Sequence, residues 1–179
     1  MFHKIKESRE TTDEEAAVTA QVVGLAALKY GDLSNQASKD YIFDIDRFTS
    51  SEGDTGPYIL YTIVRIKSIL AKYMENGGDV QAVQNEIKAP VSDSEKQLML
   101  ALAKYNASVE AACEEYAPHK ICAYIYDLAN AFNHFYHETK ILAEEDEAKK
   151  AGWIALLVLT RDVLETSIDL LGFSAPERM

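Results

Sequence analysis

The chain has 179 residues, of which 47% are apolar and 26% charged, a composition that fits one globular domain and excludes a disordered or fibrous protein. Its formal net charge of −11 opposes nucleic-acid binding through overall charge, because affinity for phosphates comes largely from Lys and Arg. The longest apolar run, residues 153–159, is far shorter than the roughly 20 residues that a membrane span requires.

The first helix is predicted over residues 13–30, where three acids fill the first turn and Gly31 and Asp32 follow a run of strong helix formers. Residues 38–51 mix aromatic residues with acids and predict an extended connector with a short helical turn. A tight loop follows at 52–57, with Thr55 or Gly56 near the cap of the next helix and Pro57 at its first position. This helix is predicted to run to about residue 73, before the NGG at 76–78.

The second half of the chain predicts four more helices. A short one is capped by Asp79 and runs to residue 89, and another covers 95–105 after a break at 90–94. Pro118 opens a helix to about residue 138, and a long helix covers 144–171, with the acids at 144–147 at its start and Gly172 after its end. No segment alternates like a strand, so the prediction is an all-α protein, a helical bundle around one core.

The helix from Pro57 has two distinct faces. Five residues at helical spacing predict its buried stripe: Ile59, Ile63, Ile66, Leu70 and Tyr73. A second set, roughly a third of a turn away, cannot enter the same core: Tyr58, Tyr61, Arg65 and Lys72. Residues 57–74 are also the only sustained basic stretch, with three cations and no acid.

This second face is predicted to be free for a ligand. Two aromatic rings followed by Arg65 offer a platform on which unstacked bases can lie, while the guanidinium reaches a phosphate or a base edge. The alternative is that both tyrosines pack under a neighbouring helix and that Arg65 pairs with an acid. Spacing alone leaves both possibilities open.

The helix from Pro118 is divided in the same way. Its apolar stripe contains Ile121, Tyr124, Ile125, Leu128, Phe132 and Phe135. Tyr126, Asn130, Asn133 and His137 lie elsewhere on the helix, with Tyr136 at the edge. Amides and aromatic rings suit hydrogen bonding to base edges, and a solvated polar face is the alternative.

Five short segments stand out by their order along the chain: ALKY at 27–30, DYIFD at 40–44, EGDTGPY at 52–58, FNHFY at 132–136 and LLGFSAPERM at 170–179. In this order they resemble the C-terminal anticodon-binding (DALR) domain of arginyl-tRNA synthetases, from about Thr12 to Met179. The loop and the PERM ending are the specific parts. Lys29 departs from the Arg that the motif usually has, and Ser51 stands where the family often has Phe.

The resemblance implies a helical bundle of the class I synthetase anticodon-binding type, which docks the anticodon loop of an arginine-accepting tRNA and reads its bases. It places Tyr58, Tyr61 and Arg65 on the helix that contacts the anticodon, and Tyr136 and Met179 around a splayed base. The predicted tRNA-binding residues are Tyr58, Tyr61, Arg65, Asn133, Tyr136 and Met179, with Lys67 and Lys72 as phosphate contacts. No DNA or membrane partner is expected.

The family's HIGH-like and KMSKS-like catalytic motifs are missing, and KIKES at 4–8 resembles the second only superficially. We therefore expect residues 1–12 to be a remnant of the linker to a catalytic domain and 13–179 to be the anticodon-binding domain. The chain alone is expected to be no enzyme and to need no cofactor, whereas the parent arginine–tRNA ligase uses ATP and Mg. Its expected partners are tRNA and its own catalytic domain.

Other interpretations of the sequence are weaker. A helical protein-interaction module without RNA binding would suit the acidic charge, with the tyrosines as interface anchors. The DTG triplet at 54–56 resembles an aspartic protease but precedes a helix, and His134, His137 and Glu138 share a helix side without further metal ligands, so no metal is expected. Cys113 and Cys122 match no disulfide framework, which predicts free, buried thiols in a reducing, cytoplasmic location.

Overall fold

The computed structural model describes residues 12–179, and every regular element in that part of the chain is a helix, which confirms the all-α prediction. Most of the predicted linker, residues 1–11, lies outside the described residues. The helices are α2 (Asp13–Leu33), α3 (Ile45–Phe48), α4 (Gly56–Glu75), α5 (Val80–Val83), α6 (Asp93–Ala103), α7 (Tyr105–Glu114), α8 (Pro118–Glu138) and α9 (Glu147–Leu170), with a 3₁₀ turn, η1, at Ile141–Ala143.

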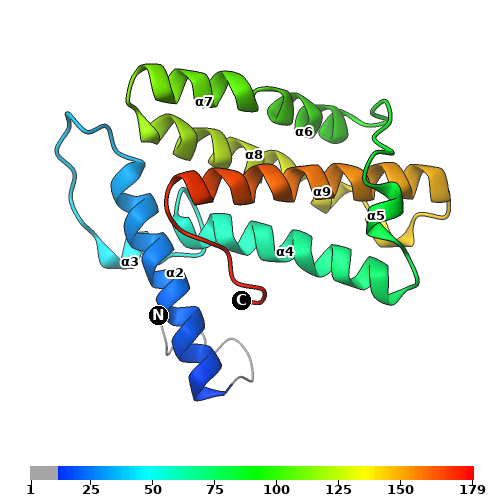
Figure 1. Ribbon diagram of the computed structural model, residues 1–179, viewed down its shortest axis with the longest axis horizontal. Coiled ribbons are helices and arrows are strands. Elements are labelled where there is room, and N and C mark those ends of the chain that lie inside the picture. The colour runs from blue at the N-terminus through cyan, green and yellow to red at the C-terminus, as the bar shows by residue number, and fades with distance from the viewer. Residues whose placement is uncertain (1–11) are drawn as a thin grey trace.

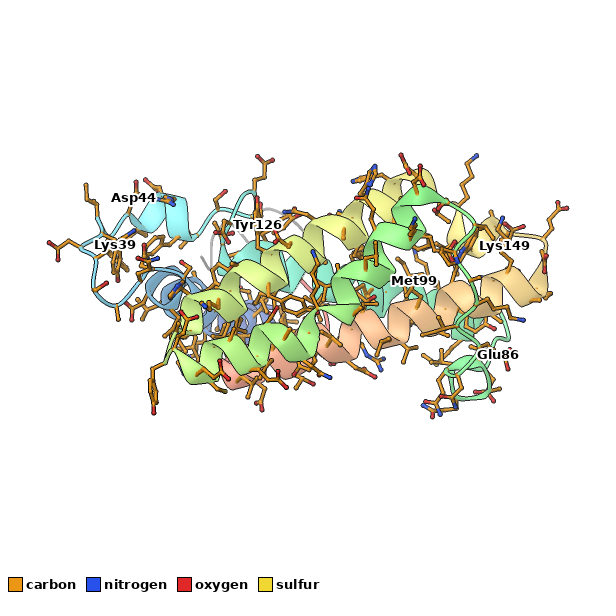
Figure 2. The ribbon with its side chains drawn as sticks, turned by 90° about the horizontal axis from the view of Figure 1, so that it is seen from above. Lys39, Asp44, Glu86, Met99, Tyr126 and Lys149 are labelled. Atoms are coloured by element: carbon orange, nitrogen blue, oxygen red, sulfur yellow. The ribbon has the colours of Figure 1, made fainter. Side chains whose placement is uncertain are left out.

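Three long helices, α4, α8 and α9, form the centre of the bundle and contact one another (Figure 1). Helices α6 and α7 pack on α8, α2 packs on α4 at one end, and α5 packs on α9 at the other. The view from above shows α6 and α7 lying over α8 and α9 (Figure 2). None of the helices in the described range has the length and apolar character needed to cross a bilayer.

The core follows the two predicted apolar stripes. All six stripe residues of α8 are buried, and so are Ile59, Ile63, Ile66 and Leu70 of α4, while Tyr73 is only partly covered. Helix α4 also buries Leu60 and Val64 outside the predicted stripe, because it is enclosed by α2, α8 and α9 rather than by one neighbour. The polar faces of α4 and α8 are thereby brought to a common edge of the bundle.

Several predicted boundaries were wrong. Helix α2 continues past Gly31 to Leu33, and Gly31 lies under Phe48, where a Cβ atom would be 2.6 Å from the ring. Helix α5 ends at Val83 rather than at 89, since Val80 is its only buried residue. Helix α7 was not predicted, because only Ala112 of it is buried and its sequence carries no apolar stripe.

Some of the remaining sequence predictions are confirmed and others are not. Helix α8 has the predicted bounds, and the predicted turn within 38–51 is α3. Helix α9 begins slightly late, with Asp146 as its N-cap. Both cysteines are free, but only Cys122 is buried; Cys113 is exposed on α7, whose one buried residue is Ala112.

Candidate nucleic-acid interface

The loop before α4 fixes where the helix begins. Thr55 accepts a hydrogen bond from the Tyr58 backbone N–H at 3.2 Å, and Gly53 has a φ of 80° that favours glycine. Gly56 packs directly on α2, where a Cβ atom would lie 2.3 Å from the Ala26 carbonyl oxygen. Asp54 accepts a hydrogen bond from buried Tyr30 at 2.5 Å, so its partner is a hydroxyl and not the second carboxyl group of a protease. The loop thus holds the first turn of α4 against α2.

Tyr58 turns toward α8 and does not stand free. Its hydroxyl donates to Asn130 Oδ1 at 2.7 Å and accepts from Asn133 Nδ2 at 2.9 Å. The Tyr58 ring also meets Tyr126 edge-on, with centroids 5.8 Å apart (Tyr126 is labelled in Figure 2). Asn133 Nδ2 donates in addition to Thr62 Oγ1 at 3.1 Å. The polar faces of α4 and α8, predicted separately, therefore form one hydrogen-bond network.

Arg65 lies between two exposed rings, Tyr61 of α4 and Tyr136 of α8. Its Cζ atom is 4.6 Å from the Tyr61 centroid and 5.0 Å from the Tyr136 centroid, and its Nη1 donates to Asn133 Oδ1. Tyr61 is 43% exposed and Tyr136 36% exposed. We call Tyr61, Arg65 and Tyr136 the platform. The alternative in which Arg65 pairs with an acid was wrong, because its partner is an amide.

Tyr136 is supported from below. Its ring stacks on buried Phe132 at 6.0 Å with an interplanar angle of 23°. Both residues lie on α8, four positions apart, so the same helix buries one ring and presents the next. The platform is therefore held by the core on one side and by the amide of Asn133 on the other.

A groove of about 490 Å³ opens beside the platform, between α4, the end of α8 and η1. Its floor is apolar and includes Ile69, Ile141 and Leu142. Three cations, two hydroxyls and one imidazole border it: Arg65, Lys72 and Lys140, Ser68 and Thr139, and His137. No Asp or Glu is among the lining residues, although the chain as a whole carries a net charge of −11.

Lys67, predicted as a phosphate contact, lies elsewhere. Its Nζ atom bonds Glu165 at 2.9 Å and Glu177 at 2.8 Å, and its side chain is 14% exposed. Burial acts to lower the pKa of Lys67, but the hydrogen bonds to Glu177 and Glu165 outweigh it and raise the pKa. Two residues from Lys67 along α4, Arg65 points to α8 instead, so these two cations serve different faces. Lys67 therefore joins α4 to α9 and to the C-terminal segment, and its predicted phosphate contact stays a prediction.

Met179 belongs to that C-terminal segment, which leaves α9 and crosses in front of α4 (Figure 1). Its side chain is partly buried against the core, and it is not among the residues that line the groove. The predicted closing of a base pocket by Tyr136 and Met179 therefore stays a prediction.

Sequence reasoning missed part of the groove. Ser68 shares the stripe of Arg65 and Lys72 at helical spacing and could have been recognised from it. Thr139 and Lys140 gave no such signal, because their positions depend on how the end of α8 and η1 lie against α4. In residues 12–179 no three His, Cys, Asp or Glu side chains lie close enough to hold a metal ion, and His134 pairs with Glu138 at 3.2 Å.

Residues 59–179 match the family described as the DALR anticodon binding domain. Among curated proteins, the arginine–tRNA ligase of Agathobacter rectalis is 64% identical over the whole chain, which corresponds to 31% of that protein. The arginine–tRNA ligase of Alkaliphilus oremlandii is 52% identical, again over the whole chain and 30% of its own length. The chain thus spans about a third of the length of these relatives.

Solved structures agree with this match. The arginyl-tRNA synthetase of Thermus thermophilus superposes with a TM-score of 0.80 at 30% identity, covering 97% of this chain and 29% of that one. The arginyl-tRNA synthetase of Plasmodium falciparum superposes with a TM-score of 0.79 at 27% identity, covering 93% of this chain and 28% of that one. The chain belongs to the DALR anticodon binding domain family, in the form that arginine–tRNA ligases carry.

Proposed function

We propose that this domain docks the anticodon loop of an arginine-accepting tRNA and so orients the tRNA for an ATP-dependent arginine–tRNA ligase. The observation that carries the proposal is the platform, in which Arg65 is fixed between two exposed tyrosine rings beside an acid-free groove. The ligases named among the relatives support it. In a whole ligase, the partners would be tRNA and the catalytic domain, which would use ATP and Mg in the cytoplasm.

The platform suits unstacked bases. Tyr61 and Tyr136 are both partly exposed, and stacking of a base on an aromatic ring contributes about 1–3 kcal/mol. Arg65 can add a charged hydrogen bond to a phosphate or a base edge without first being ordered, because Asn133 already holds it. Lys72 would contact a phosphate at the open side of the groove.

The remaining predicted contacts take different roles in this proposal. Tyr58 and Asn133 use their polar atoms on each other and on Thr62, Asn130 and Arg65, so they hold the platform in place and leave base contacts to it. Met179 remains a proposed contact on the strength of the family resemblance alone.

Binding of an unmodified arginine tRNA to the Tyr61→Ala, Arg65→Ala and Tyr136→Ala variants tests the proposal. Each tyrosine variant should bind roughly 5–150-fold more weakly, the equivalent of one lost stacking contact. Tyr116→Ala is the matched control, since Tyr116 is 91% exposed in the turn between α7 and α8, and it should bind like the unaltered chain. Unchanged affinity in folded platform variants would contradict the proposal.

A protein-interaction role is the second candidate, and one feature favours it. An apolar groove of about 440 Å³ lies between α6, α7 and α9, lined by residues that include Met99, Leu102, Leu156, Leu159 and Val163. It is separate from the platform. Salt separates the two functions, because RNA binding should weaken steeply as salt rises whereas binding at an apolar groove should change little.

A further inference from the structure

We propose that Lys72 and Lys140 form a phosphate clamp across the groove, which binds the sugar–phosphate backbone of single-stranded RNA without reading its bases. The proposal rests on the proposed function, because it assigns the partner of the same groove. It adds Lys140, which belongs to none of the conspicuous sequence patterns, and it separates charge contacts from the stacking contacts of the platform.

The two lysines come from different elements that border one groove. Lys72 lies in the last turn of α4, and Lys140 lies between the end of α8 and η1. Both side chains are exposed. The backbone on either side of Lys140 is fixed, since Thr139 caps α8 and the next residue, Ile141, is buried in the core. The position from which Lys140 extends is therefore set before any ligand arrives.

Neither ammonium group has an acidic partner within the described residues. Five other lysines of residues 12–179 pair with Glu, namely Lys67, Lys88, Lys120, Lys149 and Lys150, so an unpaired lysine is not unusual by itself and the position in the groove is what distinguishes these two. Lys72 and Lys140 make no ion pair within 4.0 Å, and no carboxylate lines the groove between them. Lys72, Lys140 and Arg65 gather at one groove without an acid, in a chain with net charge −11, and this arrangement favours an anion that comes from outside.

Two of the three acids that share a hollow with Lys140 already have partners in the fold. Lys140 also borders a second hollow that contains Glu138, Glu144 and Glu145. Glu144 bonds Lys149 at 2.7 Å, which lowers the pKa of Glu144, and it also accepts from the backbone N–H groups of residues 145 and 146. Glu138 pairs with His134. Of these three acids, only the exposed Glu145 has no ion pair within residues 12–179.

The chemistry of the groove fits a phosphodiester chain. A lysine ammonium is a compact point charge that suits phosphate oxygens, whereas base-edge readout favours the planar fork of Arg. The hydroxyl of Thr139 and the ring of His137 add polar groups beside the cations, and the apolar floor of Ile69 and Ile141 lies where a sugar would pack. The clamp would therefore hold the loop in register while the platform receives bases.

The salt dependence of binding tests the clamp. The affinity of chain 1–179 for an arginine tRNA is measured at several salt concentrations with Lys72→Gln/Lys140→Gln and with the control Lys39→Gln/Lys96→Gln. The control removes two exposed lysines outside the groove and changes the net charge equally. Each lost phosphate contact should reduce the magnitude of the slope of log affinity against log salt by about 0.7. The clamp variant removes two such contacts, so its slope should be shallower by about 1.4.

The outcomes separate the clamp from the platform. A shallower slope in the clamp variant and an unchanged slope in the control support the clamp. Equal slopes in both double variants overturn it, while weak binding by Tyr61→Ala at every salt concentration would still support the platform. Absence of RNA binding by the unaltered chain would overturn both proposals.

Discussion

Asn133 connects the parts of the interface more directly than any tyrosine does. Its amide donates to Tyr58 Oη and Thr62 Oγ1 and accepts from Arg65, and the residue is buried. A primary amide can act as donor and acceptor at once, which neither a carboxylate nor an ammonium group can do. This residue therefore couples the fold of the α4–α8 contact to the aim of the Arg65 guanidinium.

We expect Asn133→Ala to lower the free energy of unfolding by about 1–3 kcal/mol, because it removes three hydrogen bonds at a buried position, those to Tyr58, Thr62 and Arg65. The same variant should weaken tRNA binding, since Arg65 loses the contact that holds it between the rings. Urea unfolding and tRNA titration measure the two effects. Asn130→Ala, which removes one exposed acceptor, is the control, and an equal loss in both variants would argue against the central role of Asn133.

For single residues, spacing along each helix predicted which side chains lie outside the core but not which partners they contact. Tyr58, Tyr61 and Arg65 were recognised because they fall outside the apolar stripe of α4. That Tyr58 faces Asn130 while Tyr61 faces solvent could not be predicted, because it depends on where α8 lies. The acidic partners of Lys67 could not be predicted for the same reason, because they lie on α9 and in the C-terminal segment, about a hundred positions away in sequence.

Helix α4 depends on close contact with α2 at its first residue. A Cβ atom on Gly56 would lie 2.3 Å from the Ala26 carbonyl oxygen, and backbone cannot rotate away as a flexible side chain can. Gly24, one turn earlier on α2 than Leu28, has no atom within 4 Å of such a Cβ atom. The two glycines therefore make a matched pair.

Gly56→Ala should destabilise the domain by at least about 1–3 kcal/mol, the usual cost of overpacking, because α2 and α4 must separate. Gly24→Ala should stabilise it by about 0.5–1 kcal/mol, since alanine is the better helix former and meets nothing. Thermal and urea unfolding of both variants measure this difference. Similar stabilities would mean that α2 adapts to α4 more easily than the distances indicate.

The C-terminal segment is held to α4 by Lys67. We expect Lys67→Met to free it, because Glu165 and Glu177 would then repel each other, and Lys67→Arg to retain it. The cost in folding free energy should be about 1 kcal/mol or less, since Glu177 is largely exposed. Release of C-terminal residues by a carboxypeptidase measures the effect, and equal rates for the Met and Arg variants would contradict it.

Elements were predictable where burial and sequence pattern agree. Helix α8 has the predicted bounds because Pro118 opens it and six apolar residues follow one stripe. Helix α5 was predicted too long and α7 was missed, because each buries a single residue and its place is decided by α9 or α8 rather than by its own pattern. The groove depends on η1, a three-residue turn with no recognisable signal.

The stability of the whole molecule should depend most on pH in the alkaline range, because its buried titratable groups include a cysteine and tyrosines. Burial raises the pKa of Cys122 to about 12, and burial together with the Asp54 hydrogen bond raises the pKa of Tyr30. In the unfolded chain a cysteine loses its proton near about pH 8.5 and a tyrosine near about pH 10. The unfolded state then binds fewer protons than the folded one, so stability falls as pH rises through this range.

The free energy of unfolding in urea should therefore be constant from about pH 7 to about pH 8 and should decrease steadily above about pH 8.5. The first part of the decrease belongs to Cys122, so Cys122→Ala should delay the decline toward the range in which tyrosine titrates. Cys113→Ala, which changes an exposed thiol, should follow the unaltered chain. Coincident curves for all three proteins would show that Cys122 titrates normally when folded.

Lys29 of the first described helix donates a hydrogen bond to the Gly172 carbonyl oxygen at 2.6 Å, just after the end of α9. Helices α2 and α4 are made early by the ribosome, but the surface on which α4 rests includes α9. A nascent polypeptide that carries only the first helices lacks α9, so the face of α4 that packs on α9 stays exposed unless a chaperone covers it. The domain can therefore assemble only after α9 has left the ribosome. Translation pauses before Glu147 should prolong the time for which this face of α4 is open to aggregation and proteolysis.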